Sequence, residues 1–166
     1  IDCGVIKDGY WSDSAYTFKV GSVSEDVLKL VNVTRECLYK AIDVAREGMR
    51  IGDIGYAIQS YAEEFNFSVV RDLVGHGVGR NLHEEPQVPN YGKRGKGIKL
   101  QEGMVLAIEP MVNMGDYRVR QKNDGWTIVT YDNKPSAHFE HTIVVKKNKG
   151  EILTTFEYIE EIYKNV

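Results

Sequence analysis

The order of the sequence patterns along the chain is the feature that most restricts its fold. Residues 1–21 predict two strands around a turn at Lys7-Asp8-Gly9, and residues 22–48 and 52–65 each show the apolar periodicity of a helix. After residue 66 the chain consists of short apolar runs separated by turn residues. Strands, two helices and then further strands without intervening helices are typical of an α+β fold rather than of a doubly wound parallel sheet.

The ends of these elements also follow from local signals. Ser22 and Glu25 fit a capping box at the start of the first helix, and Gly48 is a suitable C-terminal stop. The final segment, residues 151–166, predicts a strand followed by a short helix. Strands in the second half are predicted over residues 68–74, 103–113, 125–130 and 137–147.

Length and composition predict one globular domain over residues 1–166, with a net charge of −3 that argues mildly against a specific nucleic-acid partner. The two cysteines, Cys3 and Cys37, form no C-x-x-C pair, so neither a disulfide scaffold nor a thiolate metal site is expected. No apolar run reaches membrane-spanning length and no signal peptide is visible, so we expect a cytoplasmic protein without a membrane partner.

Acidic residues stand inside apolar, strand-like runs at four places: Asp2, Asp13, Glu109 and Glu140. Asp2 and Asp13 can lie near each other, because the predicted turn pairs their strands. A buried carboxylate costs free energy unless a cation compensates it, and the apolar runs around these acids contain no lysine or arginine to do so. A core salt bridge usually explains one such acid, whereas four acids favour a pair of divalent metal ions.

The stretch VGHGVGRNLHEEPQVPNYG, residues 74–92, contains His76 and His83. It is not the H-E-x-x-H helix of zinc proteases, because Pro86 would break that helix and position 87 is Gln87. The glycines on either side of His76 let other backbone approach it closely. A lone histidine is more often a packed or exposed residue than a ligand, but beside four acids His76 is the candidate imidazole ligand. Carboxylates with one imidazole suit Mn, Fe, Co or Zn.

The chain resembles the type I methionine aminopeptidases in five segments that follow in the same order: IDCGVIKDGYWSDSAYTF, GHGVGRNLHEEPQVPNYG, GMVLAIEPMV, DGWTIVT and FEHTIVV. The resemblance covers almost the whole chain. It implies the pita-bread fold, in which an antiparallel curved sheet is flanked by helices, and a metallopeptidase catalytic domain with two divalent metal ions. It implies the metal ligands Asp2, Asp13, His76, Glu109 and Glu140.

The resemblance also implies a role for each ligand. Asp13 and Glu140 bridge the two ions. Asp2 binds one of them, and His76 and Glu109 bind the other. The implied reaction is removal of the N-terminal methionine from peptides and nascent polypeptides, through attack by a metal-bridging hydroxide.

Further residues match the substrate side of that family's site. The resemblance implies that His83 contacts the substrate near the scissile carbonyl and helps stabilise the tetrahedral intermediate, and that Glu109 shuttles a proton from the bridging water. Met111 and Trp126 resemble the lining of the methionine pocket, an apolar slot for an unbranched thioether. Either of these two residues alone is more often part of a core.

Two alternatives stay open at this point. Xaa-Pro aminopeptidases and prolidases share the five ligands, but Glu109 is followed here by Pro-Met-Val and Glu140 lies in EHTIVV, which favours the methionine enzymes. The second alternative is an inactive remnant of the fold that binds metal or a partner without turnover. A Xaa-Pro peptide substrate distinguishes the first alternative, and a Glu140→Gln variant the second.

The chain departs from the family at its start, because it opens directly on IDCGVI without an initiator Met. We expect it to be the C-terminal portion of a longer sequence, lacking the N-terminal part of the catalytic domain, with one further catalytic histidine and part of the methionine pocket. Leu73 and Leu82 also stand where relatives often have aromatic residues.

Two further features carry weaker expectations. His138 stands where many relatives have a neutral polar residue, and on a strand it faces the same side as Glu140. We expect a hydrogen bond that supports a ligand carboxylate rather than direct metal binding. The basic stretch YGKRGKGIKL, residues 91–100, is most simply a solvated loop, with contact to ribosomal RNA as the alternative.

Overall fold

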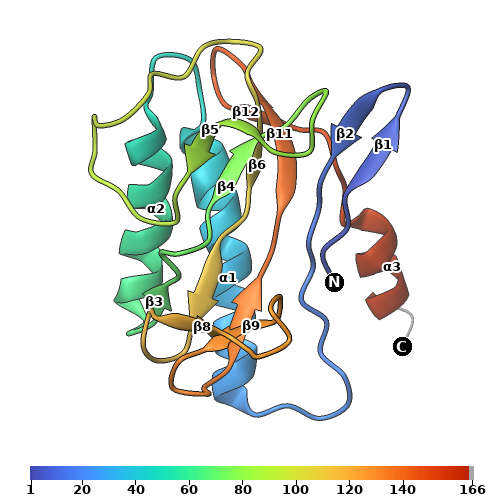
Figure 1. Ribbon diagram of the computed structural model, residues 1–166, viewed down its shortest axis with the longest axis vertical. Helices are drawn as coiled ribbons and strands as arrows, with labels where there is room; N and C mark the ends of the chain where they lie inside the picture. Colours follow the sequence, from blue (N-terminus) through green and yellow to red (C-terminus); the bar gives the residue numbers. More distant parts are fainter. Residues whose placement is uncertain (165–166) are drawn as a thin grey trace.

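A computed structural model describes residues 1–164 of the chain (Figure 1). Helices α1 (Glu25–Val44) and α2 (Ile51–Glu64) pack against each other and form a layer on one face of the strands. The short helix α3 (Glu157–Lys164) follows the last strand. The predicted α+β class, the two long helices and the strand-then-helix ending are therefore confirmed.

Two antiparallel sheets make up the second layer. The larger sheet places its strands in the order β12 (Gly150–Ile152), β11 (His141–Val145), β6 (Val105–Ile108), β4 (Gly75–Gly77) and β5 (Glu84–Val88). The smaller sheet has the order β10 (Ser136–His138), β7 (Met111–Asn113) and β3 (Ser68–Val69).

The two sheets share a pair of interrupted strands. β6 and β7 are separated only by residues 109–110, and β10 and β11 only by residues 139–140. The register is unchanged across this break, because Ile108 pairs with His141 on one side and Met111 pairs with His138 on the other. The two interruptions therefore lie opposite each other, at one level of the molecule.

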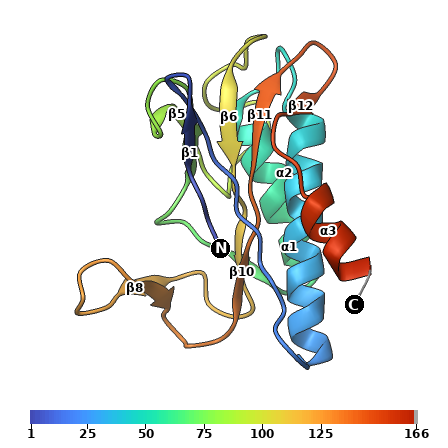
Figure 2. The ribbon, with the colours of Figure 1, turned by 90° about the vertical axis from the view of Figure 1, so that its right-hand side faces the viewer.

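The N-terminal arm, which we define as residues 1–17, is a hairpin at the side of this pair. Strands β1 (Val5–Lys7) and β2 (Tyr10–Ser12) are joined by a turn at Asp8 and Gly9, both with positive φ, as the sequence predicted. A second hairpin, β8 (Val119–Gln121) and β9 (Ile128–Thr130), projects away from the helix layer (Figure 2).

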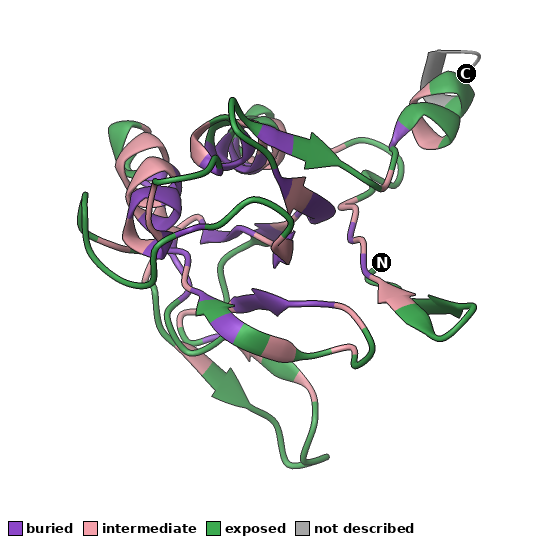
Figure 3. Cartoon of the chain, turned by 90° about the horizontal axis from the view of Figure 1, so that it is seen from above, coloured by how far each residue is buried: buried purple, intermediate pink, exposed green. Residues whose placement is uncertain are grey.

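The core lies between the helices and the two sheets, where buried residues gather (Figure 3). On α1 it takes one face of the helix, with Leu30, Val33, Thr34, Cys37, Leu38, Ala41 and Ile42 buried. The predicted capping box at Ser22 is wrong, because the N-cap is Ser24, whose hydroxyl accepts a hydrogen bond from the Val27 N–H. In the part of the chain that the structure describes, no helix combines the length and the apolar character that a membrane span requires.

Candidate metal centre

Glu109 and Glu140 lie in the break shared by the two sheets. The Glu140 N–H is turned away from the strand ladder and donates to the Ala15 carbonyl of the N-terminal arm at 2.9 Å. The Ser14 hydroxyl in turn donates to the Glu140 carbonyl at 3.2 Å. The arm thus satisfies the backbone of Glu140, and this lets the strand interrupt its ladder without leaving a buried polar group unpaired.

Asp13 is fixed by the neighbouring strand β11. Its N–H donates to the Thr142 hydroxyl at 2.9 Å, and that hydroxyl donates to the Asp13 carbonyl at 2.8 Å. Asp2 is close by, because an isolated bridge pairs it with Ala15, two residues beyond Asp13 on the same face of the hairpin. The expected proximity of Asp2 and Asp13 is therefore confirmed. Sequence reasoning missed Thr142, since threonine is common in strands and nothing else marks it.

The four acids are not all buried. Asp13 and Glu140 are 6% and 1% exposed, and the Glu109 side chain is 12% exposed. Asp2, by contrast, is exposed, like every residue from Ile1 to Tyr10 of the N-terminal arm. The argument from the cost of burial holds for the other three acids and does not apply to Asp2.

His76 lies on β4, between β5 and β6, in a stretch where no strand was predicted. A Cβ atom on Gly75 would lie 2.4 Å from the Ala107 carbonyl oxygen, and one on Gly77 would lie 2.3 Å from the Glu85 carbonyl oxygen. Glycine disfavours strands, yet here only glycine lets both neighbouring backbones come close enough to hold His76.

The tautomer of His76 follows from its backbone contact. Its Nδ1 lies 2.9 Å from the Gly77 carbonyl oxygen, which can only accept, so Nδ1 carries the proton. The Nε2 atom is left as a lone-pair donor. It lies 3.9 Å from Asp13 Oδ2 and 3.5 Å from Glu109 Oε1, so it points into the group of carboxylates.

Three of the predicted ligands meet closely enough to hold one ion. One ligand atom from each of Asp13, His76 and Glu140 lies within 4.8 Å of the other two, and all three residues are buried. Among the described residues, no lysine or arginine forms an ion pair with Asp13, Glu109 or Glu140; the nitrogen atoms within reach of Asp13 and Glu109 belong to the imidazoles of His76 and His138.

The electrostatics of this cluster favour a bound cation. Burial raises the pKa of Glu140 to about 10, and the charges of neighbouring carboxylates add to this rise, in the order Glu109, Asp13 and Asp2. Burial, followed by the charge of Asp2, also raises the pKa of Asp13. Glu140 Oε1 is covered and has no hydrogen-bond partner among the described residues. An orphaned carboxylate oxygen, an imidazole lone pair and three further acids fit a divalent metal.

The three residues predicted to contact the substrate differ in position and in burial. The His83 ring lies beside the His76 ring, with centroids 4.4 Å apart and an angle of 73° between the planes, and His83 is exposed. Met111 is buried on β7, next to His138 on β10. Trp126 lies in the loop of the β8–β9 hairpin and is 78% exposed. The pairing of Met111 and Trp126 in one pocket stays a prediction.

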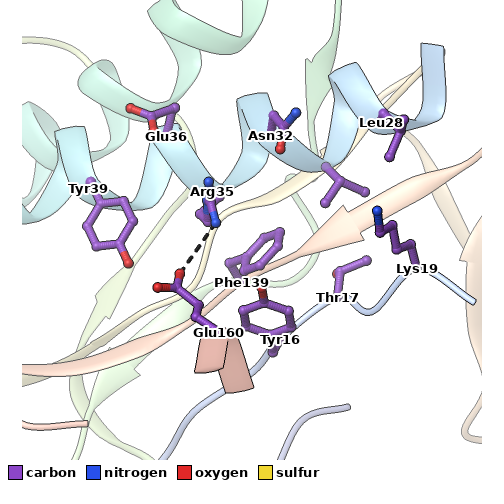
Figure 4. Close-up of a pocket in the computed structure, with 11 residues that line it drawn as sticks. Tyr16, Thr17, Lys19, Leu28, Asn32, Arg35, Glu36, Tyr39, Phe139 and Glu160 are labelled. Atoms are coloured by element: carbon purple, nitrogen blue, oxygen red, sulfur yellow. Dashed lines mark hydrogen bonds and ion pairs between the residues drawn. The ribbon is translucent and has the colours of Figure 1, made fainter. Parts of the chain in front are cut away.

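A cavity elsewhere on the molecule contains none of these residues. It lies between α1, the N-terminal arm and α3, and an ion pair from Arg35 to Glu160 at 3.4 Å crosses it (Figure 4). Tyr16, Tyr39 and Phe139 supply aromatic rings to its wall (Figure 4). It is separate from the group of metal-ligating side chains.

Residues 1–147 match the model of metallopeptidase family M24. The chain belongs to this family. It is 56% identical over 154 residues to a methionine aminopeptidase of Clostridium perfringens and 53% identical over 154 residues to methionine aminopeptidase 1 of Bacillus subtilis. These alignments cover 93% of this chain and 62% of each relative, so the chain spans a little under two thirds of their length.

Solved structures agree with this membership. A methionine aminopeptidase of Thermotoga maritima superposes with a TM-score of 0.91 at 53% identity, over 93% of this chain and 62% of that one. The prolidase of Pyrococcus furiosus gives 0.71 at 25% identity, over 93% and 40% of the two chains. The expected pita-bread fold of M24 is confirmed, and the likeness is closer to the methionine enzymes than to the prolidase.

Proposed function

We propose that this chain carries the metal site of a methionine aminopeptidase, which removes the N-terminal methionine from peptides and nascent polypeptides. The observation that carries the proposal is the meeting of Asp13, His76 and Glu140 at one point without a lysine or arginine among the described residues to neutralise them. Relatives named methionine aminopeptidase, 53–56% identical to this chain, support the choice of reaction. Residues 1–166 are proposed to act as one unit of the catalytic domain.

The proposed ligands divide between two ions of Mn, Co, Fe or Zn. Asp13 and Glu140, the most deeply buried of the acids, would contribute to both positions. Asp2 would complete one position, and His76 with Glu109 would complete the other, in keeping with the 3.5 Å between His76 Nε2 and Glu109 Oε1. Two divalent ions held close together lower the pKa of a water molecule and polarise the scissile carbonyl.

The side chains around the cluster supply the remaining steps. His83 is exposed beside the His76 ring, so its imidazole is free to donate a hydrogen bond to the carbonyl oxygen of a bound peptide. Glu109 is the carboxylate proposed to accept the proton of the attacking water and to pass it to the leaving amine. Met111, buried beside the break, and Trp126 are proposed to contact the methionine side chain.

Nascent polypeptides as substrates place the proposed activity in the cytoplasm. Contact with the ribosome is a finer proposal, supported by the exposed basic residues of the 91–100 loop. A triple charge reversal at Lys93, Arg94 and Lys96 is expected to reduce co-sedimentation with ribosomes at low salt. Unchanged co-sedimentation would rule the contact out.

The direct test is hydrolysis of a Met-Ala-Ser peptide by the purified chain. Release of methionine is expected with Mn or Co, and none with a chelator or with the Glu140→Gln variant. Parallel assays with an Xaa-Pro peptide test the alternative reaction, and cleavage of that peptide alone would replace the proposal. Metal binding without any release would instead favour the inactive remnant.

A further inference from the structure

His138 reaches the metal centre from the smaller sheet. It is the last residue of β10 and pairs with Met111 across the strand ladder, immediately before the break that holds Glu140. Its Nε2 atom lies 3.3 Å from Glu109 Oε2. This nitrogen is covered, and among the described residues it has no hydrogen bond of good geometry, so the Glu109 carboxylate is the charge that it faces.

The backbone of His138 is held on both sides by the N-terminal arm. Its N–H donates to the Thr17 hydroxyl at 2.9 Å, and the same hydroxyl donates to the His138 carbonyl at 2.6 Å. Because this backbone is fixed, the imidazole approaches Glu109 from a set direction rather than by chance rotation of a loose strand end.

Glu109 therefore stands between two imidazoles. Its Oε1 atom lies 3.5 Å from His76 Nε2, and its Oε2 atom lies 3.3 Å from His138 Nε2. The two rings play different parts, since His76 belongs to the group of three ligands within 4.8 Å and His138 does not. One carboxylate oxygen thus points to the metal cluster and the other to a group outside it.

We propose that His138 is a positioning residue for Glu109: it holds Oε2, so that Glu109 offers a single oxygen, Oε1, to the metal that it shares with His76. The inference rests on the metal site of the proposed function and deepens it. Carboxylate ligands are commonly oriented in this way by a hydrogen-bond donor outside the ligand set, and loss of such a donor costs ~10–100-fold in metal affinity. Without His138, Glu109 is free to turn and bind with both oxygens or with neither.

The first experiment compares metal binding by the whole chain and three variants, measured by calorimetry with Mn(II) and by the visible spectrum with Co(II). His138→Leu is expected to weaken binding ~10–100-fold and to alter the Co(II) absorption, whereas His138→Gln, which keeps a donor, should recover most of both. Ser136→Ala, two residues earlier on the same strand, removes a hydroxyl that donates to the Val112 carbonyl; it is the matched control and should change neither. Thermal melts confirm that each variant is folded.

A double-mutant cycle with Glu109→Gln separates positioning from direct ligation. If His138 acts through Glu109, His138→Leu should have little further effect on affinity once Glu109 is replaced. Additive losses, or equal losses for the Leu and Gln variants, would identify His138 as a ligand itself and overturn the proposal. Wild-type affinity and spectrum in His138→Leu would overturn it as well. If the parent chain binds metal no more tightly than Glu140→Gln does, the metal site on which both proposals rest is overturned instead.

Discussion

The N-terminal arm and the sheet behind it are built from the same kinds of residue, yet they differ in burial. Val5, Ile6 and Tyr10 on the arm are each more than half exposed, whereas Leu106, Ile108 and Ile143 on β6 and β11 are fully buried. The helices α1 and α2 cover the sheet and leave the hairpin of the arm uncovered (Figure 2). An apolar strand pattern therefore identifies a strand, while burial depends on what packs against it.

The same difference divides the carboxylates. Asp13 and Glu140 lie where the arm and the sheet meet, and both have raised pKa values, whereas Asp2 lies on the exposed part of the arm. The buried acids at the junction lower the stability of the fold until a cation binds, whereas the exposed Asp2 loses little solvation. The metal centre thus combines buried carboxylates at the junction with an exposed carboxylate on the arm.

The largest expected contrast between the two regions concerns their cysteines. Cys3 on the arm is exposed, whereas burial raises the pKa of the Cys37 thiol on α1 to about 12. Because the thiolate is the reactive form, iodoacetamide at pH 8 should modify Cys37 about a thousandfold more slowly than Cys3 in the folded chain. Mass spectrometry measures both rates, with the urea-unfolded chain as the control in which they should converge. Equal rates in the folded chain would contradict the burial of α1.

Glycines give the next contrast. A Gly75→Ala methyl would meet backbone at 2.4 Å inside the sheet, so we expect a loss of about 3 kcal/mol in unfolding free energy and of metal binding. Gly9→Ala on the arm has open space but a φ of 81°, so it should cost only ~1–2 kcal/mol and leave metal binding intact. Urea unfolding and calorimetry measure the two effects, and similar losses would remove the distinction between the regions.

Removing the metal should reveal the cost of burying the Glu140 carboxylate at the junction. In the folded, metal-free chain the pKa of Glu140 lies at about 10, above its usual value, so its protonated form is favoured by folding. The contribution of Glu140 to stability should therefore be fully present below about pH 4.5, and it should fall by at most ~1.4 kcal/mol per pH unit as the pH rises toward 10. Glu140→Gln should flatten this dependence, and bound Mn should offset it. Asp8→Asn, at the exposed turn of the arm, is the control, expected to leave the slope of metal-free melts unchanged. A slope as steep in Glu140→Gln as in the parent chain would refute the account.

The smallest stability effect is expected on the second hairpin. Trp126 is 78% exposed, so Trp126→Ala should change the unfolding free energy by less than ~0.5 kcal/mol. Met111→Ala, at a buried position, should cost ~2–5 kcal/mol. Peptide kinetics add a second readout: if Trp126 contacts the methionine side chain, its variant should raise KM for Met-Ala-Ser at unchanged stability. An unchanged KM would remove Trp126 from the pocket.

Local signals account for much of what could be predicted. The turn at Asp8 and Gly9 and the helix pair follow from residues close together in the chain. Strands β4 and β5 were missed, because the glycines of β4 and the glutamates and proline of β5 have little strand propensity of their own. Both segments are extended through pairing with neighbouring strands. The helix cap was misplaced by two residues, since Ser22 and Ser24 offer equivalent hydroxyls and only the folded backbone selects one.

The sequence by itself determined which residues are candidates for the metal centre: four acids in strand-like runs and an imidazole between glycines. It also determined the resemblance to one enzyme family. Tertiary structure alone decided that two strands break at one level, that Asp2 stays exposed, and that His138 faces Glu109. The reason is that these contacts join residues far apart in the sequence. Asp13 is held by Thr142, 129 residues away, and no local pattern records a pairing that forms only when the arm, the sheet and the helices pack together.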